Sequence, residues 1–123
     1  MNATLLAQSA YASPAAPMKT GRGAEYEAFS KVTNRLRAAH KTRNFNESVK
    51  ALHDNRQLWT LLAVDVADPD NGLPEELRAR IFYLAEFTLV HTSRVLAGTA
   101  SPEALIEINR TIMSGLKEQG NKR

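Results

Sequence analysis

The sequence contains no cysteine, which excludes a disulfide scaffold, a thiolate metal site and a cysteine nucleophile. It also lacks any apolar run near the roughly 20 residues that a membrane-spanning helix needs. Residues 1–12 have neither the charged start nor the long apolar stretch of a secretory signal peptide. These absences predict a cytoplasmic protein that does not insert into a membrane.

Motifs of the common enzyme classes and metal sites are absent as well. The three histidines are scattered and form no HExxH pair, and the chain has no GxSxG elbow, phosphate loop or dinucleotide fingerprint. The stretch from Asp68 to Gly72 resembles a calcium loop, but the first ligand position, five residues before the glycine, is Ala67. The sequence therefore predicts no catalytic residue, no metal and no cofactor, and a protein that is not an enzyme.

What is present is a composition typical of one folded domain. The chain has 123 residues, of which 43% are hydrophobic and 24% charged. Residues 1–53 carry eight Lys or Arg against three Glu, whereas residues 54–123 carry eight Lys or Arg against ten Asp or Glu. A solvated helix face explains an excess of this size best, and contact with a nucleic acid or an acidic protein surface is the alternative.

Apolar residues recur at helical spacing in four stretches, which we predict to be helices. The helices are expected over about 24–40, 47–67 and 74–97, and from a cap at Ser101 to about 117. Their core faces are predicted to contain Phe29, Val32, Leu36, Ala39 and His40; Leu52, Trp59, Leu62, Ala63 and Val66; Leu77, Ile81, Leu84, Thr88 and Val95; and Leu105, Ile108, Ile112 and Leu116. Turn-forming residues separate the stretches, and Gly98 is a natural helix stop.

The predicted fold is all-α, a compact antiparallel bundle of about four helices formed by residues 24–117. A short N-terminal helical arm and a Pro/Gly linker are expected over residues 1–23, and a polar tail over residues 118–123. The arm could pack on the bundle or on a partner. The pattern does not define the oligomeric state.

Two asparagines fall within apolar stripes, Asn55 on the second helix and Asn109 on the fourth. Because a buried amide is costly unless it is hydrogen-bonded, we predict that both make internal polar contacts and fix the helix register. A ligand-binding role for these side chains is the less favoured interpretation.

The second and third helices carry more apolar residues than one buried stripe can hold. Tyr83, Phe87 and Val90 form a row of their own on the third helix, and Leu58 and Leu61 project away from the Trp59 face. The functional interpretation is a groove that receives a partner's amphipathic helix. The alternative for the third helix is that neighbouring helices of the same chain cover its row. For Leu58 and Leu61 the alternative is cover by the N-terminal segment with Leu5, Leu6 and Tyr11.

The first helix also offers a weak nucleic-acid hypothesis. Nucleic-acid sites usually combine a denser positive charge with aromatic stacking residues. Here the aromatic residues belong to the predicted core face, so solvation is the favoured explanation and RNA binding is unlikely. The basic residues concerned are Lys31, Arg35, Arg37, Lys41 and Arg43.

A series of motifs occurs in a characteristic order along the chain. It extends from about Ala10 to Leu116. The motifs are Ala10-Tyr11, Glu25-Tyr26-Glu27-Ala28-Phe29, Asn55-Arg56-Gln57-Leu58-Trp59 with Asp65, Asn71-Gly72-Leu73-Pro74, Leu77-Arg78-Ala79-Arg80-Ile81, and Leu105-Ile106-Glu107-Ile108-Asn109-Arg110 with Met113 and Gly115-Leu116. Together, these motifs resemble the FlaF family of flagellar biosynthesis regulators.

The resemblance implies a cytoplasmic, non-enzymatic factor for flagellin synthesis, export and filament assembly. It implies flagellin as the partner of a chaperone-like protein, with the FlbT regulator as a possible second partner. Direct RNA binding to flagellin message and self-association as a structural adaptor are the alternative functions. The resemblance supplies no catalytic residue, because the matching motifs consist mostly of core and capping residues.

Overall fold

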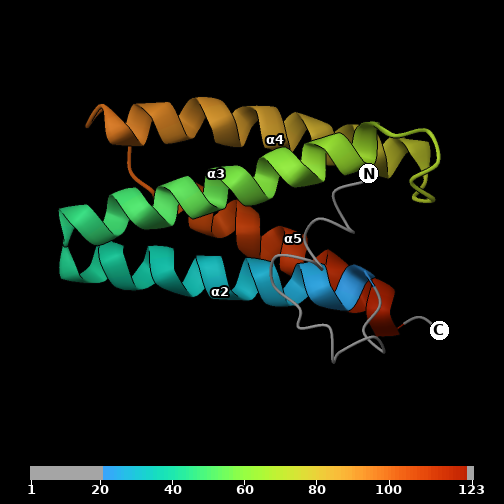
Figure 1. Cartoon of the computed structure of the whole chain (residues 1–123), viewed down its shortest axis with the longest axis horizontal. Helices are drawn as coiled ribbons and strands as arrows, with labels where there is room; N and C mark the ends of the chain where they lie inside the picture. The colour runs from blue at the N-terminus through green and yellow to red at the C-terminus, as the bar shows by residue number, and fades with distance from the viewer. Residues whose placement is uncertain (1–20, 122–123) are drawn as a thin grey trace.

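The structure, a computed structural model, describes the backbone of residues 21–121 and the side chains of residues 26–115. It consists of helices α2 (Gly21–Thr42), α3 (Phe45–Ala67), α4 (Glu75–Leu96) and α5 (Glu103–Asn121) (Figure 1). These 101 residues contain no strand, so the predicted all-α bundle is confirmed. Helix α2 begins three residues earlier than predicted, and α5 continues to Asn121, into the predicted polar tail. The predicted N-terminal arm, residues 1–20, lies outside the described residues.

The four helices do not contribute equally to the core. Helix α3 packs against both α2 and α4, and α5 packs mainly against α2. Helices α4 and α5 contact each other little, and α5 crosses behind the α2–α3 pair (Figure 1). Helices α2 and α3 are therefore the two inner helices, whereas α4 is held to the bundle mainly through α3.

Side-chain caps define where two of the helices begin. The Asn44 Oδ1 atom accepts a hydrogen bond from the Glu47 backbone N–H at 3.1 Å, which fixes the start of α3. The Ser101 hydroxyl oxygen accepts from the Glu103 N–H at 3.2 Å in front of α5. Each cap satisfies an N–H group that has no partner within its helix.

The connection from α3 to α4 is built from local side-chain contacts. Asp68 and Asn71 each accept a hydrogen bond from a backbone N–H two residues further on, at 2.9 and 3.1 Å. The Arg78 Nη1 atom donates to the carbonyl oxygens of Val66 (3.4 Å) and Asp68 (3.1 Å), so the first turns of α4 satisfy carbonyls at the end of α3. This contact sets the antiparallel register of the two helices.

Replacement by alanine should change the free energy of unfolding in opposite directions at two glycines. Gly98 has φ +82° after α4, so Gly98→Ala should lower the free energy of unfolding by about 1 kcal/mol through backbone strain. Gly115 lies inside α5, and an added Cβ would meet no atom within 4 Å. Gly115→Ala should therefore raise stability by roughly 0.5–1 kcal/mol through helix propensity. Urea unfolding measures the stability of both variants. Equal changes in the free energy of unfolding would contradict the explanation from backbone conformation.

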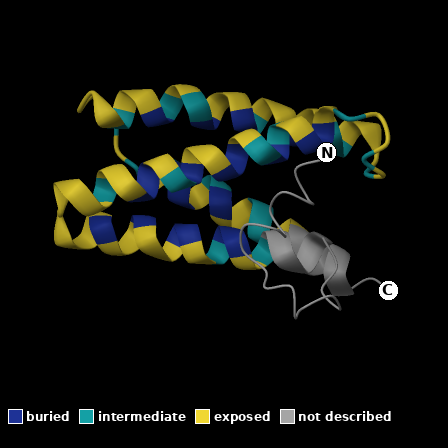
Figure 2. Cartoon of the chain, viewed as in Figure 1, coloured by how far each residue is buried: buried dark blue, intermediate teal, exposed yellow. Residues whose placement is uncertain are grey.

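The core lies between the facing sides of the helices, where buried residues gather (Figure 2). Trp59 and Phe29 are fully buried and pack edge to face, with ring centroids 5.4 Å apart. The assignment of His40 to the core face was wrong. His40 is exposed in the last turn of α2, where the bundle ends, and its Nε2 atom lies 3.4 Å from the Glu103 carboxylate on α5.

Candidate protein-binding surfaces

A cluster of polar side chains lies in the centre of the core. The Asn109 Nδ2 group donates to Asn55 Oδ1 at 2.8 Å and to Thr33 Oγ1 at 3.0 Å. The Trp59 Nε1–H donates to Asn109 Oδ1 at 2.8 Å. At most 3% of each of these four residues is exposed, so the cluster is closed to large ligands and joins α2, α3 and α5.

Asn109 has the larger share of these hydrogen bonds. It takes part in all three of them, whereas Asn55 contributes one acceptor. Within the part of the chain that the structure describes, the Asn55 Nδ2 atom is buried and has no hydrogen-bond partner. The two asparagines, which look alike in the sequence, therefore differ in what their loss would cost.

The row formed by Tyr83, Phe87 and Val90 is exposed. The exposed fractions are 67%, 40% and 57%, respectively. Helix α4 lies at the edge of the bundle, and exposed residues cover much of the side that faces away from α3 (Figure 2). The alternative that neighbouring helices cover this row therefore does not hold. We refer to these three residues as the α4 row.

Within α4, a ring-stacking contact fixes the position of Phe87, the central residue of the α4 row. The Phe87 ring stacks on the His91 ring, with centroids 5.4 Å apart and an interplanar angle of 15°. The His91 Nε2 atom lies 2.8 Å from the Ser101 carbonyl oxygen, where the Nε2–H tautomer donates a hydrogen bond. Phe87 therefore projects from a helix side that is fixed to the start of α5.

Leu58 and Leu61 do not form a second exposed wall. Leu58 is only 2% exposed and belongs to the core, and Leu61 is half-buried. The prediction for Leu58 was wrong because it assumed one narrow stripe centred on Trp59. Since α3 packs against α2 on one side and α4 on the other, its buried residues extend from Ala51 to Val66 and include Leu58.

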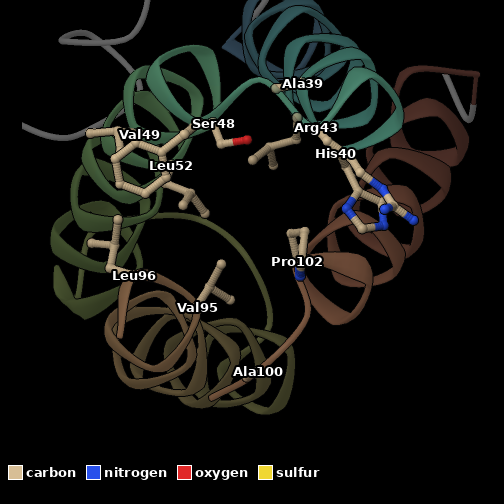
Figure 3. Close-up of a pocket in the computed structure, with 12 residues that line it drawn as sticks. Ala39, His40, Arg43, Ser48, Val49, Leu52, Val95, Leu96, Ala100 and Pro102 are labelled. Atoms are coloured by element: carbon tan, nitrogen blue, oxygen red, sulfur yellow. The ribbon is translucent and has the colours of Figure 1, made fainter. Parts of the chain in front are cut away.

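A pocket opens at the end of the bundle where the α2–α3 and α4–α5 connections lie. Its volume is about 280 Å³. In Figure 3, Val49 and Leu96 lie on one side of the pocket, and His40 and Pro102 lie on the other. Sequence reasoning missed this end pocket. The available signal was large apolar residues at helix ends, with Phe45 beginning α3 and Leu96 ending α4.

A second hollow, of about 450 Å³, lies between α2 and α5 and shares His40 with the end pocket. Arg37 and Lys41 line it from α2, and Arg110 and Glu103 line it from α5. We call it the basic hollow. Two other residues of the predicted basic set behave differently, because Arg35 on α2 pairs with Asp54 at 2.6 Å and Arg43, just after α2, lines the end pocket.

Two absences apply to the residues that the structure describes. None of the helices there is long and apolar enough to cross a membrane. Within the same residues, no three His, Asp or Glu side chains are grouped so that they could hold a metal ion.

Comparison with known proteins gives one match. Neither the curated proteins nor the solved structures contain a protein that matches the chain. The family model described as "Flagellar protein FlaF" matches residues 7–116, which is nearly the whole chain and includes all residues of the polar cluster and the α4 row. The chain therefore belongs to the FlaF family of flagellar proteins.

Proposed function

We propose that this protein binds flagellin in the cytoplasm as a chaperone-like, non-catalytic partner and thereby supports flagellin synthesis, export and filament assembly. Family membership supports the flagellar role. The observation that carries the binding proposal is the α4 row, an apolar surface that the protein's own described helices leave uncovered. FlbT is a candidate second partner in regulating flagellin synthesis.

The spacing of the row suits an amphipathic helix as the bound element. Tyr83, Phe87 and Val90 are related as i, i+4 and i+7, so they form one stripe about 10 Å long at 1.5 Å per residue. A partner helix with the same spacing can pack its apolar residues against this stripe over about two turns. The binding free energy would come from apolar burial, at about 25 cal/mol per Å² before the costs of ordering.

Charge at one end of the stripe can orient the bound helix. Arg94 follows the α4 row by one further turn and is exposed. An acidic residue at the corresponding end of the partner helix would lie near this guanidinium. The preferred partner is therefore a helix with an apolar stripe and a carboxylate at one end.

The test is the affinity for purified flagellin monomer. Val90→Asp and Phe87→Asp should each weaken binding by about tenfold or more, because a carboxylate would be buried against apolar groups. The matched control is Val64→Asp on α3. Val64 has nearly the same exposure as Val90, 51% against 57%, but lies outside the row. Fluorescence polarisation of labelled flagellin measures all three, and circular dichroism verifies folding.

Three results would count against the proposal. Wild-type protein that fails to bind flagellin would reject the function. Equal affinities for Val90→Asp and Val64→Asp would reject the α4 row as the site. Light scattering that shows self-association through the row, abolished by Val90→Asp, would favour the structural adaptor instead.

A further inference from the structure

We propose that the end pocket and the basic hollow together form a second docking site, which binds a short acidic peptide segment carrying one large apolar side chain. The pocket would receive the apolar side chain, and the cations of the hollow would pair with the flanking carboxylates. The two cavities adjoin each other, because His40 lines both of them.

The pocket is open and apolar at its rim. Phe45 is 72% exposed there, and Val49 and Leu96 are also partly exposed, while buried Leu36 and Leu52 form its inner wall. The pocket volume of about 280 Å³ exceeds that of a single large side chain, so the pocket has room for a Leu or Phe side chain. Such a side chain would extend the core at its open end.

The basic residues near the pocket indicate which residues should flank the apolar side chain of the bound peptide. Arg37, Lys41 and Arg110 converge on the hollow from two helices, and Arg43 adds a cation at the pocket. Complementing the negative end of the α2 dipole explains His40 and Lys41, while Arg110 on α5 lies 3.4 Å from the Glu107 carboxylate of its own helix. Cations from two helices beside an apolar pocket fit carboxylates that flank an apolar residue.

An acidic peptide fits this surface better than RNA does. The Glu103 carboxylate, 3.4 Å from His40 Nε2, repels any anion in the hollow, but a peptide can place its few carboxylates beside the cations, whereas an RNA chain has a negative charge at every nucleotide. RNA affinity also depends on several phosphate contacts and on stacking platforms. The pocket is lined mainly by aliphatic residues, which suit an inserted side chain.

This site is separate from the α4 row. Val95 and Leu96 line the pocket from α4, and they project about 140° and 120° away from Val90 around the helix axis. One partner helix cannot cover both surfaces of α4 at once. Substitutions can therefore distinguish the two sites.

The experiment selects random 12-residue peptides, displayed on phage, against the full-length protein. The enriched peptides should contain Asp or Glu on both sides of one large apolar residue. A synthetic copy of the best peptide is then titrated against variants by fluorescence polarisation. Selection of peptides without acidic residues, or no selection at all, would overturn the proposal.

Three variants and their controls define the site. Val49→Asp should weaken peptide binding by about tenfold or more, whereas Val64→Asp and Val90→Asp should leave it within about twofold. The double change Arg37→Glu/Lys41→Glu should also cost about tenfold or more, and its charge-matched control is Arg56→Glu/Arg80→Glu. Glu103→Gln should tighten binding by about threefold, since it removes the carboxylate from the hollow.

Two outcomes would overturn the proposal at this stage. Wild-type peptide affinity in both Val49→Asp and Arg37→Glu/Lys41→Glu would show that the peptide binds elsewhere. Tighter binding of a polyuridylate RNA than of the peptide, insensitive to Val49→Asp, would identify the hollow as a nucleic-acid site. Neither outcome depends on flagellin, so the α4 proposal stands or fails separately.

Discussion

Asn109→Leu should lower the free energy of unfolding by roughly 3–5 kcal/mol. Leucine has the same number of side-chain heavy atoms as asparagine, so the change removes polarity with little change in size. It leaves the buried Trp59 Nε1–H without its acceptor and removes the donor shared by Asn55 and Thr33. Unsatisfied buried groups of this kind cost about 1–3 kcal/mol each. Urea unfolding followed by circular dichroism measures the loss.

Two further substitutions make the test specific. Asn55→Leu should cost less than Asn109→Leu, because it removes one acceptor and also removes the unpartnered Nδ2 group. Asn34→Leu places the same substitution at an exposed position of α2 and should change stability by less than about 0.5 kcal/mol. If Asn109→Leu cost less than 1 kcal/mol, the cluster would not be a significant source of stability.

Leu58→Ala should lower the free energy of unfolding by about 2–5 kcal/mol. The side chain is 2% exposed within the core cluster, so truncation removes buried methyl groups and leaves a cavity. Unfolding in urea again gives the measurement. The m-value should stay unchanged if both states keep their compactness.

Leu61 provides the matched comparison for Leu58. It lies three residues further along the same helix and is half-buried, so Leu61→Ala should cost clearly less than Leu58→Ala. Similar losses for the two variants would mean that the burial difference between them has no energetic consequence. A loss confined to Leu61→Ala would contradict the placement of Leu58 in the core.

The helices could be predicted from sequence because local signals set their ends. Asn44 with Glu47, the turn around Asp68 and Asn71, and Gly98 all act within a few residues of themselves. The extent of the buried face could not be predicted in the same way. Leu58 is buried because α3 has neighbours on two sides, and that arrangement depends on residues far apart in the sequence.

The candidate sites, too, could be predicted from the sequence only in part. Tyr83, Phe87 and Val90 could be identified because their spacing within one helix is visible in the sequence. Their exposure depends on α4 lying at the edge of the bundle, which periodicity does not reveal. The end pocket was missed because it forms where two connections and three helices meet. No single helix carries its pattern.

The residues proposed to bind a partner and the residues that align the helices lie on different helices. The polar cluster joins α2, α3 and α5 and includes no residue of α4, while the α4 row lies on the one helix outside that cluster. The outward-facing chemistry of α4 can therefore be changed without disturbing the hydrogen bonds that align the other three helices. A variant library restricted to Tyr83, Phe87 and Val90 could thus redirect the choice of partner within an intact scaffold.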